Sequence, residues 1–174
     1  MRQYVHRVSS SSVVLPTDLW YPVTAQIKPM TADQVAIGYD HLFTKIKTTA
    51  TVEAYYKNMR NVIEYREGAN LILNNDFENE LVQGVGNAYG TEFLLKKRRG
   101  KVHGWIGYTL AWSTRQFDEL NGGERFWAKY DRRNDFSSTA SYDIIKRISI
   151  SAIWVYSTGP RFTAQTGQYV IPDP

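Results

Sequence analysis

The side chains in this sequence that could bind a metal ion or catalyse a reaction are few and scattered. The three histidines, His6, His41 and His103, fall in different segments, and none has a second ligand at the spacing of a metal site. The chain of 174 residues has no cysteine, which removes thiolate ligands, disulfides and cysteine nucleophiles. We therefore expect no metal, no other cofactor and no catalytic residue, in a protein that is not an enzyme.

Three residues in segments of alternating polarity are candidates for contact with a ligand: Glu53, Glu92 and Trp105. The carboxylates could bind a polar solute or an inner domain, and the indole ring could stack on a sugar. A solvated charge explains each glutamate equally well, and structural packing explains Trp105. Both alternatives stay open for each residue.

A second group of candidates consists of aromatic residues in two predicted long connections: Trp20, Tyr21, Phe126, Trp127 and Tyr130. Binding residues concentrate in loops, where a ligand from solution first meets a protein. Aromatic loops can instead fold over the structure below them, and this alternative stays open. The charged residues of segment 130–135 are expected to hold the base of their loop together.

These candidates are positioned by segments in which alternate side chains form two faces. Between positions 102 and 112 one face carries no charge: Val102, Gly104, Ile106, Tyr108, Leu110 and Trp112. The positions between them are mixed: His103, Trp105, Gly107, Thr109 and Ala111. A repeat of two residues predicts a β-strand with one apolar and one mixed face.

A tight basic turn is predicted to join this strand to the preceding one. A two-residue loop at positions 99–100 pairs Phe93 with Ile106, so that apolar side chains lie beside apolar side chains. In the hairpin before it, the same reasoning pairs Phe43 with Ala50.

The alternation predicts an all-β protein, an antiparallel up-and-down meander of about seven strands. We expect them at residues 2–8, 33–43, 49–65, 84–97, 102–116, 135–145 and 148–158. Long connections at 9–32, 66–83 and 117–134 alternate with short ones at 44–48, 98–101 and 146–147. Several strands exceed the usual upper length of about 10 residues. Long strands with this rhythm of connections are typical of a transmembrane β-barrel, of which seven strands form only a part.

In such a barrel the apolar face contacts membrane lipid. This assigns a lipid-facing position to Val102, Ile106, Tyr108, Leu110, Trp112, Phe93, Leu95 and Trp154. No segment approaches the roughly 18 apolar residues of a transmembrane helix. Lysine and arginine are scattered or lie in the short connections, with no stripe interleaved with aromatics, so we expect no nucleic-acid partner. Basic turns suit anionic lipid headgroups, and they suit ordinary solvated turns as well.

A soluble, aromatic-rich β-sandwich that binds carbohydrate is the alternative interpretation. Strands of a sandwich also alternate between an inner and an outer face, so periodicity does not separate the two. The distinguishing property is where the apolar face lies, because a sandwich buries it between two sheets.

Nine short segments, in this order and spacing, resemble TonB-dependent receptors of the Bacteroidota type. They are 15–20 (LPTDLW), 27–29 (IKP), 53–59 (EAYYKNM), 63–68 (IEYREG), 84–92 (GVGNAYGTE), 104–110 (GWIGYTL), 115–121 (RQFDELN), 130–133 (YDRR) and 154–159 (WVYSTG). The first of them resembles a strand-exit loop of that family. Together they extend over nearly the whole chain.

The resemblance implies an outer-membrane importer with a barrel of about 22 strands, a plug domain inside it, and coupling to the TonB complex. Its partners would be outer-membrane lipid, the plug of the same receptor, the TonB complex through an N-terminal part, and a small solute. This sequence shows no plug, no TonB box, no terminal aromatic strand and no signal peptide. We therefore expect residues 1–174 to be an internal piece of the receptor's barrel domain.

Overall fold

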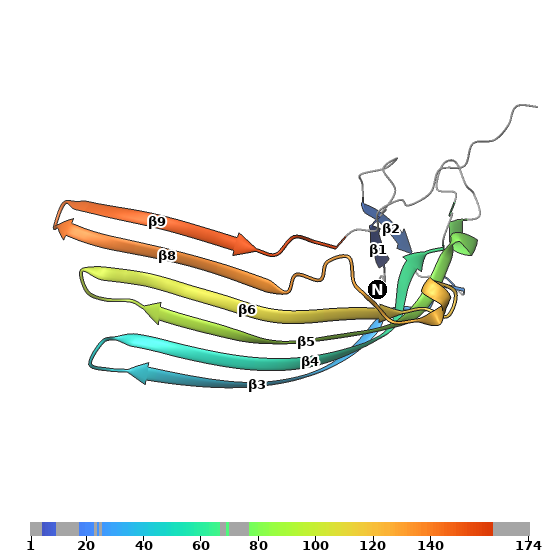
Figure 1. The fold of residues 1–174 in the computed structure, drawn as a ribbon, viewed down its shortest axis with the longest axis horizontal. Coiled ribbons are helices and arrows are strands. Elements are labelled where there is room, and N and C mark those ends of the chain that lie inside the picture. Colours follow the sequence, from blue (N-terminus) through green and yellow to red (C-terminus); the bar gives the residue numbers. More distant parts are fainter. Residues whose placement is uncertain are drawn as a thin grey trace, which may run out of the picture.

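The computed structural model describes residues 5–9, 18–22, 24, 26–66, 69 and 77–161 of the chain. Within them the protein is all-β, and its main element is a seven-stranded antiparallel sheet that does not close on itself. The long strands follow one another across the sheet in chain order, as a meander requires (Figure 1). The predicted fold class is thereby confirmed.

The strands of the main sheet are β3 (Thr31–Phe43), β4 (Thr48–Tyr65), β5 (Leu81–Lys97), β6 (Val102–Gln116), β7 (Phe126–Trp127), β8 (Asn134–Ile145) and β9 (Ile148–Ser157). The short strand β7 pairs with the end of β6, beside the path of the meander. Two short 3-10 turns, η1 (Phe77–Glu80) and η2 (Asn121–Gly123), lie in the long connections. Among the described residues, no helix is long and apolar enough to cross a membrane.

The first predicted strand does not join the main sheet, which corrects one expectation. It forms β1 (Val5–Ser9), which pairs with β2 (Asp18–Pro22) in a separate two-stranded sheet. Strand β2 lies inside the connection predicted at 9–32, so that connection is shorter than expected. A partner close in the chain costs less loop-closure entropy than one reached through a longer connection.

Both predicted hairpin registers are wrong by two residues. Phe93 lies opposite Tyr108 and not Ile106, and Phe43 lies opposite Thr48 and not Ala50. The connection between β5 and β6 is longer than the predicted two-residue loop, since β5 ends at Lys97 and β6 begins at Val102. Within it, the Lys101 carbonyl accepts a hydrogen bond from the Asp143 amide of β8 (2.8 Å). A shift of two residues leaves every side chain on its predicted face, since faces repeat with that period.

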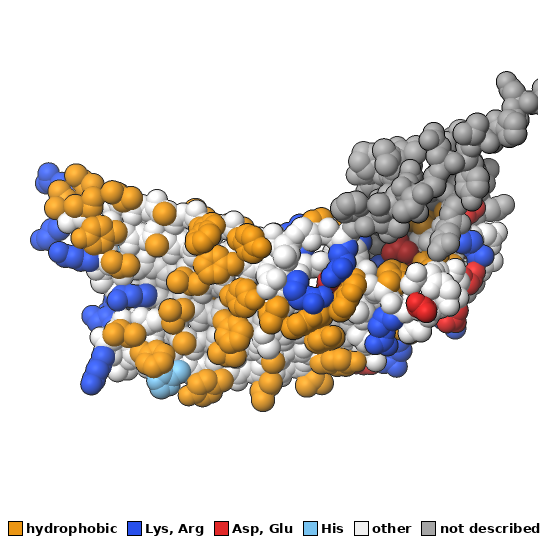
Figure 2. All heavy atoms as spheres, viewed as in Figure 1, with side chains coloured by type: hydrophobic (Ala, Val, Ile, Leu, Met, Phe, Trp, Pro, Cys, Tyr) orange, Lys and Arg blue, Asp and Glu red, His pale blue; other side chains and the backbone are white. Residues whose placement is uncertain are grey.

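One face of the sheet, which we call the apolar face, exposes large hydrophobic side chains across all the long strands. The register places on it every residue predicted to face lipid. Val35 is 74% exposed, Ile37 75% and Trp154 66%. Figure 2 shows hydrophobic side chains spread over the length of the strands. Although β1 of the two-stranded sheet contacts β4, large hydrophobic side chains of this face stay exposed on every long strand.

The buried core is small and lies at the end of the sheet that carries the long connections. One cluster contains Ile27, Ile63, Tyr65 and Leu81, and the other contains Val62, Val82, Phe117 and Leu120. A β-bulge at Asn61, whose φ is +55°, separates the buried end of β4, which contains Val62, Ile63 and Tyr65, from the rest of the strand. After the bulge, adjacent residues of β4 are buried on opposite faces.

Gly104 permits a close approach of β6 to β8. Its φ is +150°, and a Cβ atom there would lie 2.0 Å from the Thr139 carbonyl oxygen. We expect Gly104→Ala to lower the free energy of unfolding by about 1–3 kcal/mol, because the strands must separate locally. Denaturant unfolding in detergent measures it. Gly107→Ala on the same strand is the control, because its nearest contact would be an ordinary 3.4 Å, and an equal loss in both variants would contradict this account.

Candidate functional site

The apolar face ends at a sharp boundary near the long connections. One row of side chains runs Val35, Tyr56, Tyr89 and Trp112 across four strands. The next row, one step along each strand on the same face, is polar and runs Asp33, Asn58, Asn87 and Thr114. The Tyr56 hydroxyl donates a hydrogen bond to the Asn87 side-chain oxygen across this boundary (3.1 Å). In membrane proteins, amphipathic rings are enriched at the boundary between an apolar band and polar residues.

Aromatic pairs across neighbouring strands hold the apolar face together. The rings of Tyr89 and Trp112 stack with centroids 5.3 Å apart, and those of Phe93 and Tyr108 stack at 6.3 Å. Such cross-strand pairs each add roughly 0.2–1 kcal/mol relative to alanine pairs. The sheet therefore keeps its register without burying this face in a protein core.

The height of the apolar face matches a membrane. On β6 it runs from Val102 to Trp112, and on β3 from Val35 to Phe43. Tilted strands cross the hydrocarbon core of a bilayer with about 9–11 residues. These two stretches have that length.

The opposite face carries the candidates on the strands. Glu53 and Glu92 lie directly opposite each other on β4 and β5. Trp105 shares this face but lies closer to the turns, where its ring reaches the space beside Gly107, 3.4 Å from where a Cβ would be. The structure therefore brings the two carboxylates together and leaves Trp105 apart from them. The two carboxylates repel each other, and because both glutamates are exposed, solvent weakens this repulsion.

The aromatic candidates of the connections have different surroundings. Phe126 stacks on Phe117 (5.9 Å) at the edge of the core, whereas Tyr130 is 56% exposed. Trp20 and Tyr21 belong to strand β2 and not to a loop, which corrects that expectation; their side chains are outside the described part of the structure. Trp127 lies on β7, opposite Thr114. The candidates whose side chains the structure describes thus do not form one binding site.

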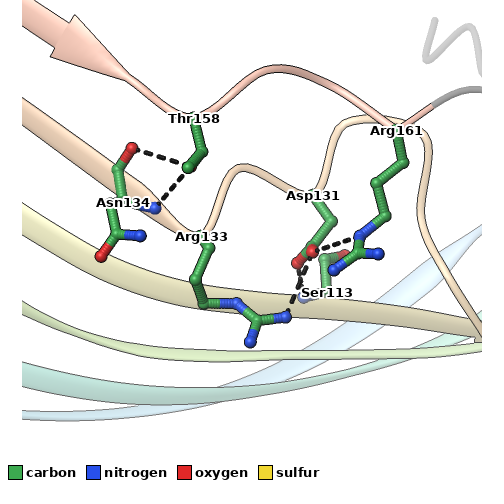
Figure 3. Close-up of polar contacts among 6 residues, drawn as sticks. All are labelled: Ser113, Asp131, Arg133, Asn134, Thr158 and Arg161. Carbon is green, nitrogen blue, oxygen red and sulfur yellow. Dashed lines mark hydrogen bonds and ion pairs between the residues drawn. The ribbon is translucent and has the colours of Figure 1, made fainter.

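Asp131 is the centre of a cluster that fixes the long connection after β6 (Figure 3). Its side chain is 1% exposed. The Ser113 amide donates to Oδ1 (2.8 Å), Arg161 Nε donates to Oδ2 (3.1 Å), and Arg133 Nη2 lies 3.4 Å from Oδ2. The expectation that charges of segment 130–135 hold the loop base is confirmed for Asp131 and Arg133. Ser113 and Arg161 lie far away in sequence, and no pattern pointed to them.

Arginine side chains of this cluster also cover tryptophan rings. The Arg133 guanidinium lies 5.0 Å from the Trp112 ring centre and 4.6 Å from that of Trp127, and Arg161 lies 5.2 Å from Trp127. Cation–π contacts of this kind contribute about 0.5–1 kcal/mol at exposed sites. Trp127, a candidate for ligand contact, is therefore engaged by the protein's own arginines.

Sequence reasoning missed an open cleft of about 340 Å³ at the boundary of the apolar face. Its lining residues are Tyr56, Asn87, Tyr89, Thr114, Arg125, Phe126 and Trp127. Six of them lie on β4, β5, β6 and β7, and Arg125 directly precedes β7, so only the observed strand pairing brings them together.

The histidines on described long strands have local contacts. The His41 ring packs edge-on against Phe43 (4.5 Å), and His103 Nδ1 lies 3.7 Å from the Asp143 carboxylate. The described residues contain no group of three or more side chains that could hold a metal ion.

Comparison with family models, curated proteins and solved structures finds no match for this chain.

Proposed function

We propose that the main sheet is part of the wall of a transmembrane β-barrel, with its apolar face against lipid and its opposite face toward an aqueous lumen. The observation that carries this proposal is the band of exposed hydrophobic side chains that ends sharply at the row of Tyr56, Tyr89 and Trp112. A soluble protein rarely exposes a large contiguous apolar surface. In a bilayer, contact with hydrocarbon removes the free-energy cost of exposing these side chains to water.

The two edges of the sheet support the same proposal. Strands β3 and β9 have a sheet neighbour on one side only among the described residues. Long free edges invite aggregation in a soluble protein. In a barrel wall, further strands pair with both edges.

The kind of barrel is proposed from the sequence resemblance alone. On that ground it belongs to a TonB-dependent receptor in the outer membrane, which imports a scarce small solute and encloses a plug domain. The strands supply the wall, and the connections after β4 and β6 face the outside. Glu53, Glu92 and Trp105 then lie on the lumen side, within reach of a plug or a passing solute. The chain itself catalyses no reaction in this proposal.

Quenching of single tryptophans by brominated lipid tests the proposed wall. Trp154 lies on the apolar face and Trp105 on the opposite one. In vesicles of phosphatidylcholine with brominated acyl chains, we expect a variant with only Trp154 to lose most of its fluorescence. A variant with only Trp105 keeps most of its fluorescence, because its indole does not contact the acyl chains.

The alternative β-sandwich gives a different result. Its tryptophans are indifferent to brominated lipid, and the chain is a monodisperse monomer without detergent. That combination would overturn the barrel proposal. Equal quenching of Trp154 and Trp105 would also contradict it, because both faces would then contact lipid.

A further inference from the structure

The meander places all the short turns of the main sheet at one end (Figure 1). These turns and the residues flanking them are rich in cations and contain no acid. We call the following side chains the basic rim: Lys45, Lys47, Lys96, Lys97, Arg98, Arg99, Lys101, Lys146 and Arg147. Figure 2 shows Lys and Arg gathered at this end of the strands.

The basic rim is open to a partner. All its side chains except the half-buried Lys97 are exposed. None of them forms an ion pair with a carboxylate within the part of the chain that the structure describes. Asp143, an acidic residue near the rim, pairs instead with His103 (3.7 Å). Unpaired cations held together on rigid turns create a local positive potential.

Exposed aliphatic side chains lie between these cations. Ile46 is 54% exposed, Val102 54%, Ile145 57% and Ile148 52%. In an ordinary solvated turn, these aliphatic side chains would only be exposed to water, without any gain in stability. A nucleic-acid surface would offer them no apolar partner. A membrane interface accommodates both, because aliphatic groups enter the acyl region while cations stay among the headgroups.

We propose that the basic rim binds the phosphate groups of anionic phospholipids and so fixes which end of the strands lies at that surface. This inference rests on the proposed function, since the strands must cross a bilayer for the rim to reach its headgroups. The described acids of the long connections, Glu78, Glu80, Asp118, Glu119 and Glu124, lie at the opposite end. Exposed cations such as Arg125 and Arg132 lie at that end too, so charges of both signs are mixed there, whereas the basic rim consists of cations alone.

The test compares the full chain with two variants that lose the same charge. The rim variant is K96Q/R98Q/R99Q/K101Q, in one exposed turn. The control variant is R60Q/R66Q/R125Q/R132Q, whose positions are exposed and far from that turn. Association is measured at low salt with vesicles of phosphatidylcholine alone and of phosphatidylcholine with phosphatidylglycerol.

We expect the rim variant to lose about tenfold or more of the affinity for the anionic vesicles, because each cation near such a surface adds to the attraction. The control variant should keep an affinity close to that of the unmodified chain. The charge-conserving variant K96R/K101R should also bind like the unmodified chain. Equal losses in the rim and control variants would overturn the inference, because net charge alone would then explain binding.

Failure of this inference is distinguishable from failure of the proposed function. Insertion into neutral phosphatidylcholine, read from quenching of Trp154 by brominated lipid, does not depend on the basic rim. If all variants insert there and share one affinity for anionic vesicles, the rim inference alone is wrong. If none inserts, the barrel proposal and the rim inference both fail.

Discussion

Ile106→Arg is expected to lower the free energy of unfolding in phosphatidylcholine vesicles by about 2–4 kcal/mol, the cost of a lipid-facing arginine near the bilayer midplane. Ile106 lies on the apolar face between Leu95 and Ser138 and is 47% exposed. An arginine there has no protein carboxylate in its row to offset loss of hydration. Denaturant unfolding of the chain refolded in vesicles measures the difference.

Thr109→Arg is the matched control. It lies on the same strand but on the opposite face, between Glu92 and Asp135 of the neighbouring strands. We expect a change of at most about 1 kcal/mol, because an arginine on that face has water and two carboxylates beside it. Equal costs for the two variants would contradict the assignment of faces. A cost for Ile106→Arg that persists in buffer without lipid or detergent would place Ile106 in a protein core instead.

Asp131→Ala is expected to lower the free energy of unfolding by about 2–4 kcal/mol. The change removes the acceptor for the Ser113 amide and the partner of two arginines at a site where the aspartate is 1% exposed. Removing one partner of a buried ion pair leaves uncompensated charge, although the partial exposure of Arg133 and Arg161 moderates the cost. Amide hydrogen exchange at Ser113 and Ala128 should accelerate, since this cluster holds the connection onto β6.

Two variants make the result for Asp131 specific. Asp131→Asn keeps one oxygen for the Ser113 amide but loses the charge and the second acceptor oxygen, to which Arg161 Nε donates. Its effect should be smaller than that of alanine, because one of the hydrogen bonds remains. Asp118→Ala removes an exposed carboxylate of the same connection and should change stability by less than about 0.5 kcal/mol. If Asp131→Ala behaved like Asp118→Ala, the cluster would not stabilise the loop.

The faces of the strands could be predicted from sequence, but their register could not. Side-chain direction depends on position along one strand, so the alternation around Ile106 and Thr109 was sufficient. Register depends on the turn, and a slip of two residues restores the same match of apolar with apolar. Leu95 beside Ile106, as observed, fits the pattern as well as Leu95 beside Gly104 does. The turn between β5 and β6 also contacts β8, through the hydrogen bond from the Asp143 amide to the Lys101 carbonyl, and the pattern of one hairpin does not contain such a contact.

The Asp131 cluster and the aromatic row at the boundary of the apolar face depend on contacts between distant segments. Arg161 follows β9 and Ser113 lies on β6, and only the folded connection brings both to one carboxylate. The row of Tyr56, Tyr89 and Trp112 likewise exists only once three strands are paired. Each aromatic alone is an unremarkable strand residue. Their alignment beside a polar row gives the apolar face a boundary, and the sequence pattern contained no such boundary.

The bulge at Asn61 has a consequence for how β4 is stabilised. On the turn side of Asn61, β4 belongs to the proposed wall, in which its apolar side chains contact hydrocarbon. Beyond it, the protein itself buries residues on both faces of β4. Val62 lies on one face, and Ile63 and Tyr65 lie on the other. Under that proposal, one continuous strand passes from a lipid environment into a protein core. The residue at the bulge, Asn61, has the left-handed backbone conformation, which asparagine adopts more readily than most other residues.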